Sequence, residues 1–133
     1  MELQGKRGAG AFQWNRGGWF GSQVGATLWL VLLGGVLLVQ WQPVGGLLVL
    51  CGVVPNLIGF ALWRRRQSIS PYPAIQILIT VCGCGALIAM LGLRVLSLSQ
   101  SASEMPSVWF LLMYPGLMLA FHLQEKAARR AAA

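Results

Sequence analysis

The chain has 133 residues, of which 56% are hydrophobic and only 10% are charged. Soluble domains carry about 25% charged residues, so this composition excludes an ordinary soluble domain and favours an integral membrane protein. The ten Lys and Arg residues outnumber three Glu residues, Asp is missing altogether, and the net charge is +7.

Residues 1–18 combine Lys6, Arg7 and Arg16 with several glycines and with Trp14. This glycine content disfavours an amphipathic helix. We therefore expect an interfacial segment on the cytoplasmic side, with Trp14 and Trp19 as anchors among the lipid headgroups.

The first apolar run covers residues 19–39 and contains no charged residue. A helix of this length can cross a hydrocarbon core of about 30 Å. Gly17, Gly21 and Gly25 stand four residues apart at its start, so they share one helical face. Because a bare glycine face lets a neighbouring backbone approach closely, we predict that these residues contact another helix.

The second apolar run covers residues 44–63. Gly45, Gly52 and Gly59 recur along it every seven residues, and Asn56 lies on the same stripe. This pattern predicts a second packing face with one polar residue set into it. Pro55 has no backbone N–H to donate, so we expect a kink in this helix.

Arg64, Arg65 and Arg66 end the second run at a short loop. A third apolar run covers residues 74–93, and a fourth covers 105–123, where Pro115 predicts another kink. Residues 124–133 form a basic tail. The sequence thus predicts an all-α membrane protein whose membrane domain, 19–123, is an antiparallel bundle of four transmembrane helices.

The two halves of the chain show a weak internal similarity at an offset of sixty residues. It matches Gly25 with Gly85 and Pro55 with Pro115. Apolar segments match easily by chance, so both a duplicated hairpin and coincidence remain open; a duplication would give a parallel repeat.

The basic residues fall almost entirely on one side of the predicted spans. Arg94 lies on the other side, whereas nine of the ten precede the first span, separate the second from the third, or follow the fourth: Lys6, Arg7, Arg16, Arg64, Arg65, Arg66, Lys126, Arg129 and Arg130. The positive-inside rule therefore predicts that both termini are cytoplasmic. These flanking positions also favour anionic lipid headgroups as partners over nucleic acid, with Arg16, Arg64, Arg65, Arg66 and Lys126 in contact with them.

Polar residues within the spans are few, and they lie in the half of the bilayer nearest the cytoplasm. We expect them to form one intramembrane cluster that hydrogen-bonds across helices: Gln23, Thr27, Asn56, Gln76 and Thr80. The opposite half holds nothing more polar than cysteine in the first three spans, so one subunit alone should not form a pore.

The sequence offers no residue set for catalysis. The spans contain no Asp or Glu, the single His122 lacks an acidic partner, and no glycine loop suited to phosphate occurs. We therefore expect no catalytic residue, metal or cofactor. Small multidrug transporters are similar in length and span number, but their working residue is a glutamate in the first span, and residues 19–39 contain none.

Two functions remain open. The glycine faces favour a non-enzymatic accessory or assembly subunit that packs against other membrane helices, either in a larger complex or by self-association. The alternative is a small oligomeric channel or transporter whose path forms at the interfaces between subunits.

Overall fold

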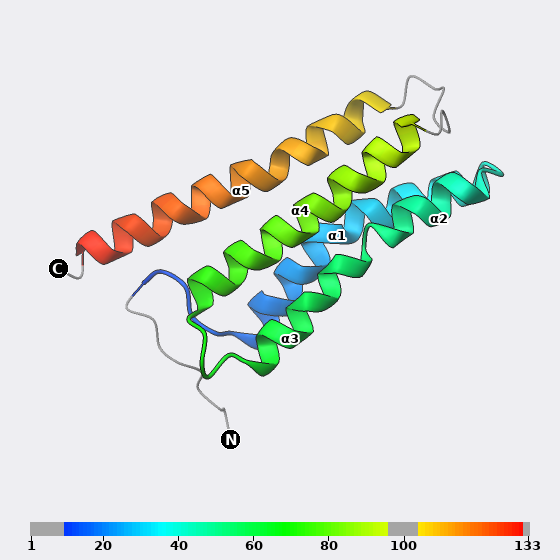
Figure 1. The fold of residues 1–133 in the computed structure, drawn as a ribbon. Helices are drawn as coiled ribbons and strands as arrows, with labels where there is room; N and C mark the ends of the chain where they lie inside the picture. The colour runs from blue at the N-terminus through cyan, green and yellow to red at the C-terminus, as the bar shows by residue number, and fades with distance from the viewer. Residues whose placement is uncertain (1–9, 96–103, 132–133) are drawn as a thin grey trace.

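The computed structural model describes residues 10–95 and 104–131 of the chain, and the regular structure in these ranges is helical (Figure 1). The segments are α1 Arg16–Val39, α2 Pro43–Cys51, the 3-10 helix η1 Val54–Leu57, α3 Ile58–Arg64, α4 Pro71–Val95 and α5 Glu104–Ala131. Within these ranges, three helical runs are long and apolar enough to cross a membrane: Arg16–Val39, Pro43–Arg64 and Pro71–Val95. The linker between α4 and α5 lies outside the described residues.

Helix α1 begins three residues before the predicted apolar run because Asn15 caps it. The Oδ1 atom of Asn15 accepts a hydrogen bond of 2.9 Å from the backbone N–H of Gly17. Such a cap satisfies a donor that the first helical turn leaves free. At its other end, α1 passes into α2 through a tight turn in which Trp41 adopts a positive φ of 59°.

The second helical run is interrupted near Pro55, the position at which the sequence predicts a kink. Between α2 and α3 the backbone makes hydrogen bonds of the tighter i to i−3 type, such as Asn56 N–H to Val53 O at 2.9 Å. Pro55 lacks the N–H that a continuous α-helix would need here. The run is therefore divided into two α-helical halves joined by η1.

At Pro115, where the sequence predicts a second kink, α5 continues as one helix without an interruption like that at Pro55. The two prolines differ in their surroundings. Pro55 lies against Gly85 of α4, whose added Cβ would come within 2.7 Å of the proline Cγ, whereas Pro115 is exposed. The helix is therefore interrupted at Pro55, where α4 packs against the altered backbone, and it continues at Pro115, which is exposed.

Helix α4 lies at the centre of the arrangement, with α5 along one side of it and α1, α2 and α3 along the other (Figure 1). It contacts each of the other helical segments, whereas α5 packs mainly against α4. Among the described residues, the largest fully buried side chains belong to α1, α2 and α4: Leu30, Val49, Leu78 and Cys82. The core therefore lies between the first three helical runs.

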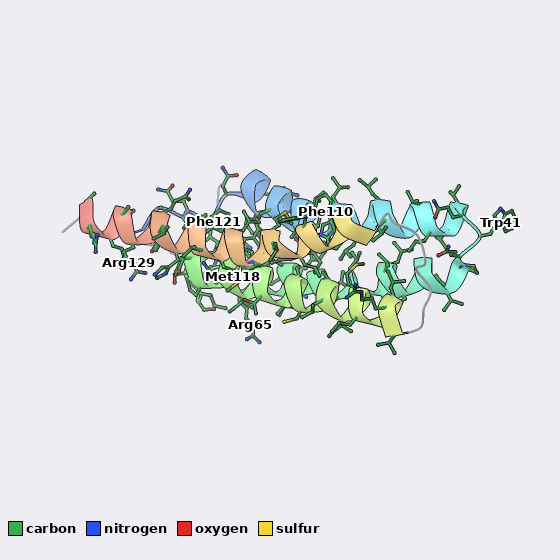
Figure 2. The ribbon with its side chains drawn as sticks, turned by 90° about the horizontal axis from the view of Figure 1, so that it is seen from above. Trp41, Arg65, Phe110, Met118, Phe121 and Arg129 are labelled. Atoms are coloured by element: carbon green, nitrogen blue, oxygen red, sulfur yellow. The ribbon has the colours of Figure 1, made fainter. Side chains whose placement is uncertain are left out.

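Basic residues gather at one end of the molecule because successive helices alternate in direction. Arg16 begins α1, Arg64 ends α3, and Arg129 and Arg130 lie near the end of α5. Figure 2 shows Arg65 and Arg129 well away from Trp41, which projects from the turn at the opposite end. We call the end of the molecule that carries Arg65 and Arg129 the basic end. Arg94 lies at the other end of α4, and Lys6 and Arg7 fall outside the described residues.

Two of the pairs matched at the sixty-residue offset occupy different environments. Gly85 is buried against the second helical run, whereas Gly25 is exposed on α1. Pro55 interrupts its helix and Pro115 does not. These two pairs therefore play different structural roles.

Candidate functional site

The most polar part of the interior lies where α1 crosses the interrupted helix. The Nδ2 atom of Asn56 donates to Gln23 O and to Thr27 Oγ1, each at 2.7 Å. In return, Gln23 Nε2 donates to the backbone carbonyl of Asn56 at 2.8 Å. All of these side chains are at least nine-tenths buried, since Gln23 is 5%, Thr27 3% and Asn56 8% exposed. We call Gln23, Thr27 and Asn56 the polar cluster.

The interrupted backbone and a glycine make room for the polar cluster. Asn56 lies within η1, and Trp19 donates its indole N–H to the backbone carbonyl of Gly59, one helical turn further on, at 3.1 Å. A Cβ added to Gly59 would lie only 2.5 Å from Gln23 Cδ. Glycine at 59 therefore allows the Gln23 carboxamide to lie against the backbone of α3.

Trp19 is also the first correction to the sequence interpretation. We expected Trp14 and Trp19 to anchor the N-terminal segment among headgroups, but Trp19 is only 5% exposed. Trp14 is half-buried and donates its indole N–H to Ile69 O at 3.1 Å. The two rings contact each other, with centroids 4.8 Å apart. Both therefore serve internal packing at the basic end.

Two acceptors in the polar cluster have no hydrogen-bond partner within the described residues. They are Gln23 Oε1 and Asn56 Oδ1, both inaccessible to solvent. Their amide nitrogens are oriented toward backbone carbonyls, so rotating either amide by 180° would break the bonds that hold it. An unpaired buried oxygen of this kind costs about 1–3 kcal/mol. The polar cluster thus retains unused capacity to accept hydrogen bonds.

The polar residues expected to form one cluster divide into two groups. Gln76 and Thr80 of α4 face α5 instead of the polar cluster. Gln76 Nε2 donates to Met118 O at 3.2 Å, and Thr80 Oγ1 lies 3.7 Å from Met118 Sδ. Nearer the basic end, Tyr72 and His122 continue the same contact through a hydrogen bond of 2.9 Å. The second group therefore forms a polar seam between α4 and α5.

An aromatic contact joins α5 to α1, and the sequence interpretation missed it. The Trp29 indole N–H donates to the Tyr114 hydroxyl at 3.1 Å, and this hydroxyl in turn donates to Ala26 O. Phe110 stacks on Trp29 with centroids 5.3 Å apart. The available signal was the occurrence of Trp and Tyr inside apolar runs, where their polar atoms require partners.

Several glycines bring helix backbones into close contact. A Cβ on Gly85 would lie 2.9 Å from Gly52 O, and one on Gly46 would lie 3.0 Å from Gly34 O. The first contact joins α4 to the turn before η1, and the second joins α1 to α2. Of the predicted packing residues, Gly45, Gly52 and Gly59 are buried in the second helical run. The sequence interpretation did not predict Gly34, Gly46 or Gly85 as packing residues.

The other predicted glycine stripe lies on the outer surface of the chain. Gly17, Gly21 and Gly25 are exposed, and a Cβ on Gly21 or Gly25 would meet no atom within 4 Å. The same face of α1 continues with exposed apolar side chains that include Val24 and Leu28. We call Gly17, Gly21, Val24, Gly25 and Leu28 the outer α1 face. All five of its residues are exposed in the described structure.

Comparison of the chain with models of protein families, with curated proteins and with solved structures finds no match. A functional proposal therefore depends on the residues themselves. Within the described ranges, no three His, Cys, Asp or Glu residues are grouped so as to hold a metal ion. The polar cluster consists of two neutral amides and a hydroxyl, which can donate and accept hydrogen bonds.

The predicted headgroup-binding residues lie at the basic end with differing freedom. Arg16, Arg64, Arg65 and Lys126 are exposed. Arg66 is half-buried, with its guanidinium 4.9 Å from the centre of the Trp63 ring and its Nη1 donating to Trp63 O at 3.1 Å. Arg66 therefore combines its charge with a packing role.

Proposed function

We propose that this chain is a four-span integral membrane protein with both termini in the cytoplasm, and that it acts without catalysis as an accessory or assembly subunit. Its outer α1 face would pack against a helix of another membrane protein or of a second copy. In this proposal the apolar part of α5, residues 105–123, forms the fourth span. The basic end would lie at the cytoplasmic surface, where its arginines contact anionic lipid headgroups.

One observation carries the proposal: some glycines lie at contacts between the chain's own helices, whereas others are exposed on its surface. Gly34, Gly46, Gly52 and Gly85 lie at close contacts between its helices, whereas Gly21 and Gly25 of the outer α1 face have open space around them. Glycine inside a helix costs roughly 0.5–1 kcal/mol relative to alanine. A close contact with another helix would offset this cost, whereas lipid would not.

A comparison of two glycine variants tests the proposal. Gly21→Leu places a side chain on the outer α1 face, and Gly116→Leu makes the same change at an open position on α5. After solubilisation of native membranes in a mild detergent, we expect the parent and Gly116→Leu to migrate as a complex larger than the isolated chain. Gly21→Leu should migrate as the isolated chain with an unchanged melting temperature.

Migration of all three proteins at the same size would contradict the accessory function. So would a selective ion flux produced by the purified protein alone in liposomes and abolished by Asn56→Leu. That second result would support the alternative, a channel or transporter whose path forms between subunits. The observation favouring this alternative is the interrupted helix beside two buried, unpaired amide oxygens. Irregular backbone and polar groups at membrane depth mark many transport sites.

A further inference from the structure

The residues before α1 run across the basic end and contact several helices. Residues 10–14 are not helical, yet they touch α5, the start of α4, the loop before it and the end of α3. We call residues 10–14 the latch. Sequence reasoning placed this segment on the lipid headgroups, and the structure places it against the protein.

The latch is fixed to α5 through a buried carboxylate. Glu125 is only 5% exposed, and its Oε2 atom accepts the backbone N–H of Ala11 at 2.9 Å. Its other oxygen accepts a hydrogen bond of 2.9 Å from Arg129 Nε, one turn further along α5. Gly10 lies directly over the carboxylate, and a Cβ there would overlap its atoms. This attachment therefore requires both the carboxylate and the glycine.

Aromatic side chains extend the latch over the remaining helices. The Phe12 ring lies between Phe121 of α5 and Tyr72 of α4, with centroid distances of 5.2 Å and 6.0 Å. Trp14 packs edge-on against Trp63 near the end of α3, at 5.7 Å. Figure 2 shows Phe121 on α5 between Met118 and Arg129, so the latch covers the part of α5 nearest the basic end.

The rest of α5 is attached less broadly than the other helices. It packs mainly against α4, and its contact with α1 through Tyr114 lies about three turns before Glu125. We propose that the latch fastens the basic end of α5 to the other helices, and that it opens as a local unit without unfolding of the core. Opening frees residues 117–131, with the charges of Lys126, Arg129 and Arg130, and breaks the Tyr72–His122 contact.

Hydrogen exchange followed by mass spectrometry tests this latch in the full chain held in lipid nanodiscs. Two variants release the attachment from opposite sides: Glu125→Ala removes the acceptor, and Gly10→Ala inserts a methyl group against it. We expect either variant to speed exchange in residues 10–16 and 117–131 about tenfold or more, because a hydrogen bond to a charged group is lost. Exchange in residues 75–90 of α4 should stay unchanged.

Matched controls make the result decisive. Lys126→Ala changes the exposed neighbour of Glu125, and Gly35→Ala adds a methyl group to α1 where nothing lies within 4 Å. Both should exchange like the parent. Unchanged exchange in residues 117–131 of Gly10→Ala would overturn the proposal. Equal acceleration in residues 75–90 would overturn it too, because the contacts would then belong to the general core.

Discussion

Thr27 shows what a buried hydroxyl contributes in this molecule. Its Oγ1 accepts a hydrogen bond from Asn56 across two helices, and the side chain is only 3% exposed. Thr80 offers a comparison within the same chain. It is exposed, and its hydroxyl donates to Gln76 O one turn earlier in its own helix at 2.8 Å. The two threonines thus have the same chemistry in different settings.

We expect Thr27→Val to lower the free energy of unfolding by about 1 kcal/mol, because the Asn56 amide loses one of its acceptors. Thr80→Val should change it by less than about 0.5 kcal/mol, because both hydrogen bonds of its hydroxyl are exposed and the one to Met118 Sδ is long, at 3.7 Å. Reversible unfolding of both variants in detergent would measure the difference. Equal effects would show that the polar cluster contributes nothing specific to stability.

The depth of the polar residues could be read from the sequence, but their partners could not. Counting residues from the basic clusters gives the position of Asn56 along its helix, because the helical rise is constant. The direction in which a side chain points depends on how each helix is rotated against its neighbours. This rotation directs Gln23 and Thr27 toward Asn56 but directs Gln76 and Thr80 toward Met118. The contact between Trp29 and Tyr114 depends on the same rotation.

At the scale of helices, glycine position decides which pairs pack closely. Gly85 and Gly25 have the same chemistry and a similar place in their runs. A Cβ on Gly85 would lie 2.7 Å from Pro55 Cγ and 2.9 Å from Gly52 O, whereas one on Gly25 would meet nothing within 4 Å. Neither neighbour of Gly85 can rotate away, since one is a ring and the other a backbone atom.

Gly85→Ala should therefore lower the free energy of unfolding by about 1–3 kcal/mol, the usual cost of overpacking. Gly25→Ala should leave stability unchanged or raise it by up to about 1 kcal/mol, since alanine favours helix. Unfolding of the purified variants in the same detergent would test this pair. The close contact of α4 with the second helical run would be refuted if Gly85→Ala proved as stable as Gly25→Ala.

The helical runs themselves were largely predictable, and their interruptions only in part. Uninterrupted apolar sequence located α1 and α4 to within a few residues, because helix length must match the thickness of the bilayer. Pro55 signalled the interruption of the second run correctly. Pro115 did not interrupt α5, and the difference depends on a contact with Gly85 that the local sequence does not encode. The sequence likewise did not indicate that Gly17, Gly21 and Gly25 lie on the exposed face of α1.

At the scale of the whole molecule, the fold gathers basic residues from several helices at one end. The alternating helices bring Arg64, Arg65, Arg66 and the end of α5 to the same end. The latch covers that end, where its Trp14 ring packs against Trp19 and Trp63. The central claim is that this basic end faces the cytoplasm and that the chain crosses the membrane four times.

Labelling of single cysteines in intact cells tests this claim most directly. Ser68→Cys and Ala127→Cys mark the basic end, and Trp41→Cys marks the turn between α1 and α2, where the side chain is 92% exposed. The parent serves as the control, since its cysteines all lie within the predicted spans. An impermeant maleimide should label Trp41→Cys from outside, and should label the other two only after the membrane is opened. Labelling of Ser68→Cys from outside, or of Ser68→Cys and Ala127→Cys from different sides, would contradict the account.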